Sequence, residues 1–116
     1  MPDFSDSQPI YLQIRQRIIE LILAGRFGAD GALPSVRQIA TDLAVNPLTV
    51  TRAYQSLVDL GVVETRRGLG MFATTGAREK LLAHEREKFL SAEWPDLKRR
   101  IAQLDLDLKE LMKGGK

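Results

Sequence analysis

The sequence predicts a mainly α-helical protein with a small β-hairpin, followed by a two-helix C-terminal tail. Two amphipathic helical patterns lie within residues 35–61 and are separated by only about three residues. A segment rich in β-forming residues and glycine follows at 62–74, and leucines recur at helical spacing near the C-terminus. This order of elements is typical of a winged helix-turn-helix. We therefore expect such a domain at 1–75 and a two-helix dimerisation region at 76–116.

The composition limits the possible classes of protein. A chain of 116 residues with 44% hydrophobic residues can bury one main core. It has no cysteine, which excludes disulfides and thiolate metal sites. The apolar runs are too short to span a membrane, and the segment MPDFSDSQ lacks the features of a signal peptide. We expect a cytoplasmic protein with no membrane partner.

The first helix is predicted over residues 9–24. Its apolar residues recur at helical spacing, Pro9 suits the first turn, and Gly25 suits the C-terminal cap. A second apolar stripe that includes Ile19 runs along another side of this helix. We therefore expect the first helix to pack against neighbours on more than one side.

The second helix is predicted from Ser35 to Leu43. Ser35 and Gln38 form the Ser-x-x-Gln pattern of a capping box, in which the serine hydroxyl accepts a hydrogen bond from a free N–H of the first turn. Arg37 lies in that turn, where a phosphate could also meet free N–H groups. Ser35 and Arg37 are therefore candidate DNA-binding residues.

The third helix is predicted from Pro47 to Leu60. Asn46 suits the cap, proline suits the first helical position, and Gly61 suits the end. The helical period turns four residues toward the core: Val50, Ala53, Tyr54 and Leu57.

The opposite side of the third helix predicts the recognition surface. A step of about 100° per residue places Arg52 there, flanked by Thr49 and Thr51. Arg52 is the best candidate to read guanine O6 and N7, and the threonines can contact phosphates or bases. Leu48 is either a contact for a thymine methyl group or an isolated surface leucine. Asp59 repels phosphate, so we expect the end of this helix to tilt away from the duplex.

A hairpin is predicted over residues 62–74, where two strand-like segments surround a turn that contains Gly68 and Gly70. Arg66 and Arg67 precede the turn. A compact basic tip can follow the phosphate backbone or enter a narrow minor groove, and glycine permits close approach. The alternative is a charged pair that only keeps the turn soluble.

The tail is predicted to form one helix from Gly76 and a second after Pro95. Five apolar residues of the second helix alternate spacings of four and three, as in the a and d positions of a coiled coil. They are Leu97, Ile101, Leu104, Leu108 and Leu111. We favour self-association through this seam over packing within one chain.

No catalytic motif is present in the sequence. There is no nucleophile elbow, and RRGLGMF lacks the spacing of a nucleotide-binding loop. His84 is the only histidine and has no neighbours at metal-ligand spacing. We therefore expect no enzyme, no metal and no cofactor. The net charge of +2 is small, so any DNA binding must depend on individually placed arginines.

Taken in order, LPSVRQIATDLAVNPLTVTRAYQSLVDLGVVETRRGLGMFA resembles the winged-helix domain of the GntR family of bacterial transcriptional regulators, over roughly residues 9–74. The short tail resembles the YtrA subfamily, whose members dimerise through such a tail, lack a large effector domain and are associated with transporter operons. The subfamily often has Asn-Pro-Asn-Thr where this chain has Asn-Pro-Leu-Thr. The resemblance implies DNA contacts at Arg37, Asn46, Thr49, Thr51, Arg52, Arg67, Gly68 and Gly70.

These observations predict a homodimeric, sequence-specific repressor of an operon that binds double-stranded DNA at an inverted-repeat operator. Helix 46–60 would enter the major groove, and wing 62–74 would contact the backbone or minor groove. The alternative is a winged-helix module that binds another protein, in which case the arginines should be buried in ion pairs. The sequence identifies no effector.

Overall fold

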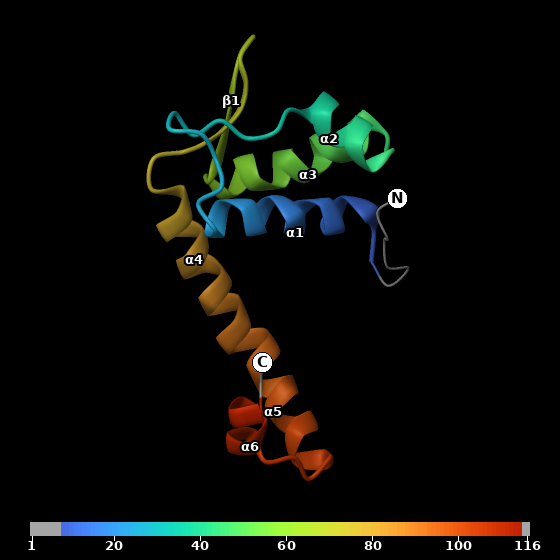
Figure 1. Cartoon of the computed structure of the whole chain (residues 1–116), viewed down its shortest axis with the longest axis vertical. Coiled ribbons are helices and arrows are strands. Elements are labelled where there is room, and N and C mark those ends of the chain that lie inside the picture. Colours follow the sequence, from blue (N-terminus) through green and yellow to red (C-terminus); the bar gives the residue numbers. More distant parts are fainter. Residues whose placement is uncertain (1–7, 115–116) are drawn as a thin grey trace. The chain divides into compact units, whose positions relative to one another are not determined.

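The computed structural model describes residues 8–114 (Figure 1). Residues 1–7 and 115–116, which the predicted domain bounds include, lie outside the described part. The fold is mainly helical with one antiparallel hairpin, which confirms the predicted fold class. The elements are α1 (Ile10–Leu23), α2 (Val36–Leu43), α3 (Pro47–Leu60), β1 (Val63–Arg66), β2 (Gly70–Ala73), α4 (Ala77–Lys88), the π-helical turn η1 (Phe89–Glu93), α5 (Trp94–Gln103) and α6 (Leu108–Gly114). No helix within residues 8–114 is long and apolar enough to cross a membrane.

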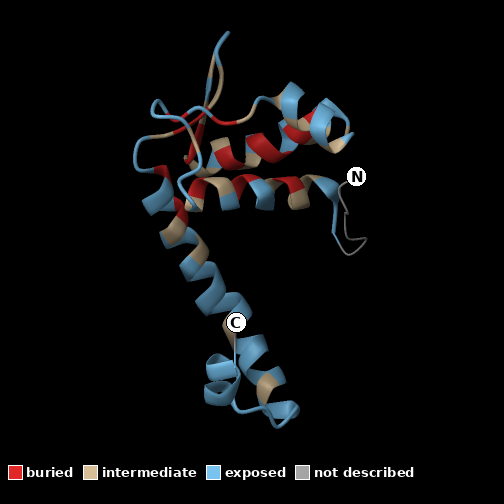
Figure 2. Cartoon of the chain, viewed as in Figure 1, coloured by how far each residue is buried: buried red, intermediate tan, exposed pale blue. Residues whose placement is uncertain are grey.

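The core of the first compact unit lies between α1 and α3, which run alongside each other (Figures 1 and 2). The inward residues of α3 are all buried, as predicted, and Ile19 on the second stripe of α1 is buried as well. Removing this apolar surface from water supplies the main driving force for the fold. The buried residues of the two helices are Ile14, Ile18, Ile19, Ile22, Val50, Ala53, Tyr54 and Leu57.

Side-chain caps fix the short turn between α2 and α3. The Ser35 hydroxyl accepts a hydrogen bond from the Gln38 N–H at 3.0 Å, and the Asn46 side chain accepts one from the Leu48 N–H at 2.8 Å. The turn between them contains Ala44 at φ +56°. These caps are the predicted ones, and they set where the two helices of the motif begin.

Tyr54 ties α3 to the segment that leads into α2. Its side chain is 1% exposed, and its hydroxyl donates a hydrogen bond to the Pro34 carbonyl. Burial raises the pKa of Tyr54, because a phenolate would lose its hydration there. The hydroxyl therefore stays protonated and keeps donating to the Pro34 carbonyl, which fixes the start of the motif.

The hairpin pairs Val63 with Ala73 and Arg66 with Gly70. The segment before α2 lies alongside β2, through a bridge between Ala32 and Phe72. Gly31 allows this approach. It has φ +89°, and a Cβ atom placed on it would lie 2.7 Å from the Ala73 carbonyl oxygen. The wing is thereby attached to the segment that enters the helix-turn-helix.

The start of α4 belongs to the core of the first unit. Ala77 and Leu81 are buried. The Arg78 Nε donates to the Leu23 carbonyl at 2.8 Å and the Lys80 Nζ to the Gly61 carbonyl at 3.2 Å. These cations thereby donate to carbonyls at the C-terminal ends of α1 and α3, and the Gly61 carbonyl also accepts from the Thr74 hydroxyl. The chain divides into two compact units after Leu82, inside α4.

The prediction that Pro95 separates two tail helices is wrong. The backbone stays helical from α4 through η1 into α5, and Pro95 lies in the first turn of α5. Proline lacks the N–H of a regular helical bond, and its ring crowds the preceding turn. The wider turn η1, in which the Trp94 N–H donates to the Phe89 carbonyl, accommodates the proline without ending the helix.

The prediction of one continuous a/d seam is also wrong. Residues 104–107 are not helical, and Asp105 adopts φ +53°. The Asp107 carboxylate then accepts hydrogen bonds from the Lys109 and Glu110 N–H groups and starts α6. The heptad spacing did not account for this aspartate cap. Leu97 and Ile101 therefore lie on α5, Leu104 follows its end, and Leu108 and Leu111 lie on α6.

Candidate nucleic-acid interface

The outward face of α3 presents polar and charged groups opposite its buried face. Arg52 and Thr51 are exposed, and Thr49 is half-buried. Leu48 is 75% exposed in the first turn of the helix. Further along, the Gln55 amide donates to the Asp59 carboxylate at 2.9 Å. The four inward residues hold the helix in the core and leave its N-terminal half free to meet a partner.

Arg52 is held by an aromatic ring of α1. Its guanidinium carbon lies 3.8 Å from the centroid of the Tyr11 ring, a cation–π distance. Tyr11 is half-buried and packs against the edge of the core. Both residues line a shallow hollow of about 380 Å³ between the first turns of α1 and α3, together with Pro9, Ile10, Leu48 and Thr49.

Arg37 lies on the other helix of the motif. It is exposed, and it lines a second hollow of about 500 Å³ with Val45 and Pro47 at the start of α3. Asn46 is exposed between the two helices, and its side-chain oxygen is engaged in capping α3. The structure thus brings Arg37, Asn46 and the first turn of α3 together. Ser35 is exposed as well, but its hydroxyl is engaged as the cap of α2.

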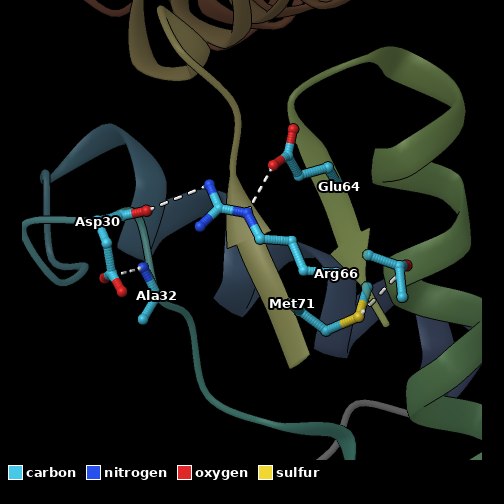
Figure 3. Close-up of polar contacts among 6 residues, drawn as sticks. Asp30, Ala32, Glu64, Arg66 and Met71 are labelled. Carbon is cyan, nitrogen blue, oxygen red and sulfur yellow. Dashed lines mark hydrogen bonds and ion pairs between the residues drawn. The ribbon is translucent and has the colours of Figure 1, made fainter. Parts of the chain in front are cut away.

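The two arginines of the wing have different surroundings. The Arg66 guanidinium donates to the Glu64 carboxylate at 2.7 Å and to the Asp30 carbonyl at 3.4 Å (Figure 3). It also lies 3.9 Å from the centroid of the Phe72 ring. Residues 64, 66 and 72 share one face of the hairpin because side chains alternate along strands. Arg66 therefore stabilises the wing from the last position of β1. Its side chain does not extend from the tip of the hairpin.

The wing tip consists of Arg67, Gly68 and Leu69. All three are exposed, and the Leu69 N–H donates to the Arg66 carbonyl at 2.8 Å to close the turn. Gly68 has φ +77°, a conformation that glycine adopts without strain. Gly70 begins β2 opposite Arg66. The tip thus presents one exposed guanidinium on a narrow turn.

The sequence did not predict the contact between Tyr11 and Arg52. The helical period assigned it to the apolar face of the first helix, and it does pack at the edge of the core. Its contact with Arg52 joins residues far apart in the sequence. The spacing of apolar residues along one chain contains no signal for such a contact. His84 is exposed, with its Nδ1 3.3 Å from the Glu85 carboxylate.

Known proteins share this arrangement. The model for "Bacterial regulatory proteins, gntR family" matches residues 10–72. The chain is 34% identical over 111 residues to the uncharacterized HTH-type transcriptional regulator YhcF of Bacillus subtilis (strain 168), covering 96% of this chain and 90% of YhcF. It is 42% identical over 80 residues to the HTH-type transcriptional repressor YtrA of the same strain, covering 69% of this chain and 62% of YtrA.

A solved GntR family transcriptional regulator from Listeria monocytogenes has the same fold, with a TM-score of 0.74, 31% identity and 95% of each chain covered. The family match begins with α1 and ends within β2, so it contains both helices of the motif and the wing tip. These relatives are regulators of transcription and not enzymes. The chain therefore belongs to the GntR family of bacterial regulatory proteins and is a transcriptional regulator with a DNA-binding helix-turn-helix.

Proposed function

We propose that this regulator is a homodimeric repressor that acts in the cytoplasm and binds an inverted-repeat operator. The N-terminal half of α3 enters the major groove, where Arg52 reads a guanine and the threonines contact phosphates or neighbouring bases. The wing follows the backbone or the adjacent minor groove through Arg67. The two recognition helices occupy successive major grooves, about 34–36 Å apart.

The observation that carries the proposal is the two-sided character of α3. One side is buried in the core through Val50, Ala53 and Tyr54, while Arg52 on the other side is exposed. A helix anchored in this way can be inserted into a groove without any loss of core packing. Arg37 is exposed at the start of the same motif.

Exposure of the arginines supports specific DNA reading over a protein-interaction module. That alternative expects the arginines to be buried in ion pairs. Arg37, Arg52 and Arg67 are exposed, and the ion pair of Arg66 with Glu64 leaves 38% of the arginine side chain exposed. Exposed guanidinium groups are suited to phosphates and guanine edges.

The proposal of a dimer rests on the second compact unit. Residues 83–114 contain no buried residue. Their large apolar side chains are exposed in the single chain. This leaves an apolar surface in contact with water, which is energetically unfavourable. They include Phe89, Leu90, Leu97, Leu104, Leu106, Leu108, Leu111 and Met112. A second copy supplies an apolar partner for this surface, and a twofold dimer matches an inverted repeat.

Titration of the protein with a labelled random-sequence duplex at several salt concentrations tests DNA binding itself. We expect affinity to fall steeply with salt because phosphate contacts release counterions. Arg37→Gln should weaken binding and make its salt dependence shallower. Arg26→Gln removes the same charge from an exposed position just after the C-terminal end of α1, and it is the matched control. Absence of binding at low salt, or equal effects of the two variants, would contradict the proposal.

A further inference from the structure

The contact between Tyr11 and Arg52 joins the first turn of α1 to the recognition surface of α3. The guanidinium carbon lies 3.8 Å from the ring centroid, so the positive charge lies against the face of the ring. Attraction between a cation and this face is stronger when the pair is shielded from water. Tyr11 meets this condition in part, because it is half-buried and packs against the core.

The geometry leaves Arg52 able to form hydrogen bonds. A guanidinium that stacks on a ring uses the face of its plane, whereas its N–H donors lie within the plane and point outward from its edge. Bidentate reading of guanine uses that edge. One guanidinium can therefore stay on Tyr11 and contact a base at the same time.

An exposed arginine on a helix normally samples many rotamers and loses this freedom when it binds. The ring of Tyr11 restricts that sampling before DNA arrives. The main chain of Tyr11 is itself held, because Ile14 on the next turn of α1 is fully buried. The Tyr11 ring is thus held in place beside the long, flexible side chain of Arg52.

We propose that Tyr11 is a positioning residue for Arg52 and thereby sets how strongly one base pair of the operator is read. This inference rests on the proposed function. It assigns no DNA contact to Tyr11, whose ring acts through the guanidinium. The contact needs the ring and not the hydroxyl, so phenylalanine should replace tyrosine and an aliphatic residue should not.

The test uses the full chain and the duplex that the wild-type protein enriches most from a random pool, together with all single base-pair changes of that duplex. The variants are Tyr11→Phe, Tyr11→Leu, Tyr11→Met, Arg52→Ala and the double variant Tyr11→Leu/Arg52→Ala. Melting curves identify any variant that is not folded, and methionine provides a second ring-free side chain if leucine disturbs the helix.

Tyr11→Phe should bind within about twofold of the wild type. Tyr11→Leu and Tyr11→Met should lose about 3- to 10-fold on the best duplex, because the Arg52 side chain then loses its conformational freedom only when it binds. Their discrimination should weaken at the same base pair as in Arg52→Ala, with an unchanged salt slope. The double variant should bind no more weakly than Arg52→Ala, because Tyr11 acts only through that residue.

Three results would overturn the role of Tyr11. Tighter binding by the ring-free variants would mean that the ring withdraws Arg52 from DNA. Equal loss at every base pair would indicate a general structural effect, and additive losses in the double variant would indicate that Tyr11 contacts DNA itself. Failure of the proposed function is a different result, in which neither the wild type nor Arg52→Ala shows any base preference.

Discussion

Neighbouring arginines of the wing differ in what they contact. Arg66 is engaged by Glu64, Asp30 and the Phe72 ring, whereas Arg67 is exposed at the tip. Arg67→Ala should lower the affinity for all duplexes by a similar factor and reduce the salt slope of the proposed dimer by about 2, because it removes one phosphate contact from each subunit. Titrations at several salt concentrations measure both quantities. An unchanged slope would show that the wing tip does not contact phosphate.

Arg66→Ala is the matched comparison and should act on stability first. Loss of the contact with the Phe72 ring should cost about 0.5–1 kcal/mol of unfolding free energy, the usual range at an exposed site. Chemical denaturation checks this value. The salt slope should stay near that of the wild type, and a drop as large as that of Arg67→Ala would mean that Arg66 leaves its partners to contact DNA.

At the scale of the elements, the bond between Tyr54 and Pro34 holds α3 to the start of α2. Tyr54→Phe should lower the unfolding free energy by about 1–2 kcal/mol, because it leaves a part-buried carbonyl without its donor. Denaturation at neutral pH measures the loss, and a change below about 0.5 kcal/mol would contradict the assignment of this bond as an important link.

The same residue predicts a pH dependence. Burial raises the pKa of Tyr54 in the folded state, so the unfolded state releases this proton at lower pH. The contribution of Tyr54 to stability is therefore complete below the ordinary tyrosine pKa of about 10 and is lost as pH rises above it. Stability of Tyr54→Phe should decline less steeply above about pH 10, and equal declines would show that Tyr54 does not titrate with unfolding.

The turn between α2 and α3 contains a strained position. Ala44 has φ +56°, a conformation in which its Cβ atom is crowded by the backbone. Glycine has no Cβ atom and adopts this conformation without strain. Ala44→Gly should therefore raise the unfolding free energy by about 0.5–1 kcal/mol. The exposed Ala83 in the middle of α4 is a control, because glycine inside a regular helix should destabilise instead. A loss of stability at residue 44 would show that the alanine side chain makes contacts that outweigh the strain.

Elements with strong local signals could be predicted from the sequence. Ser35 and Asn46 cap their helices, and the inward residues of α3 are buried, because caps and apolar periodicity act over a few residues. The tail was predicted less well. Pro95 is accommodated by η1, and Asp107 starts a new helix inside an otherwise regular heptad spacing. Contacts of Tyr11 and Arg66 with distant residues depend on the folded chain and have no local signal.

At the scale of the whole molecule, the proposed dimer makes the tail responsible for joining two half-site contacts. Leu97→Glu places a charge on the exposed apolar surface of α5, while Gln103→Glu adds the same charge at an exposed polar position of that helix. Leu97→Glu should shift the protein from dimer to monomer in sedimentation equilibrium and weaken operator binding by about 100-fold or more, because two linked half-sites reinforce each other. A wild-type monomer, or a dimer unaffected by Leu97→Glu, would refute this assignment.

Selection of bound sequences from a random duplex pool at near-physiological salt tests the central claim most directly. We predict enrichment of an inverted repeat whose half-site centres are about one helical turn apart, with a preferred guanine in each half-site that Arg52→Ala no longer selects. Enrichment of a single half-site would contradict the dimeric arrangement. Recovery of unselected duplexes, with only salt-sensitive general binding or none, would contradict specific DNA reading by α3.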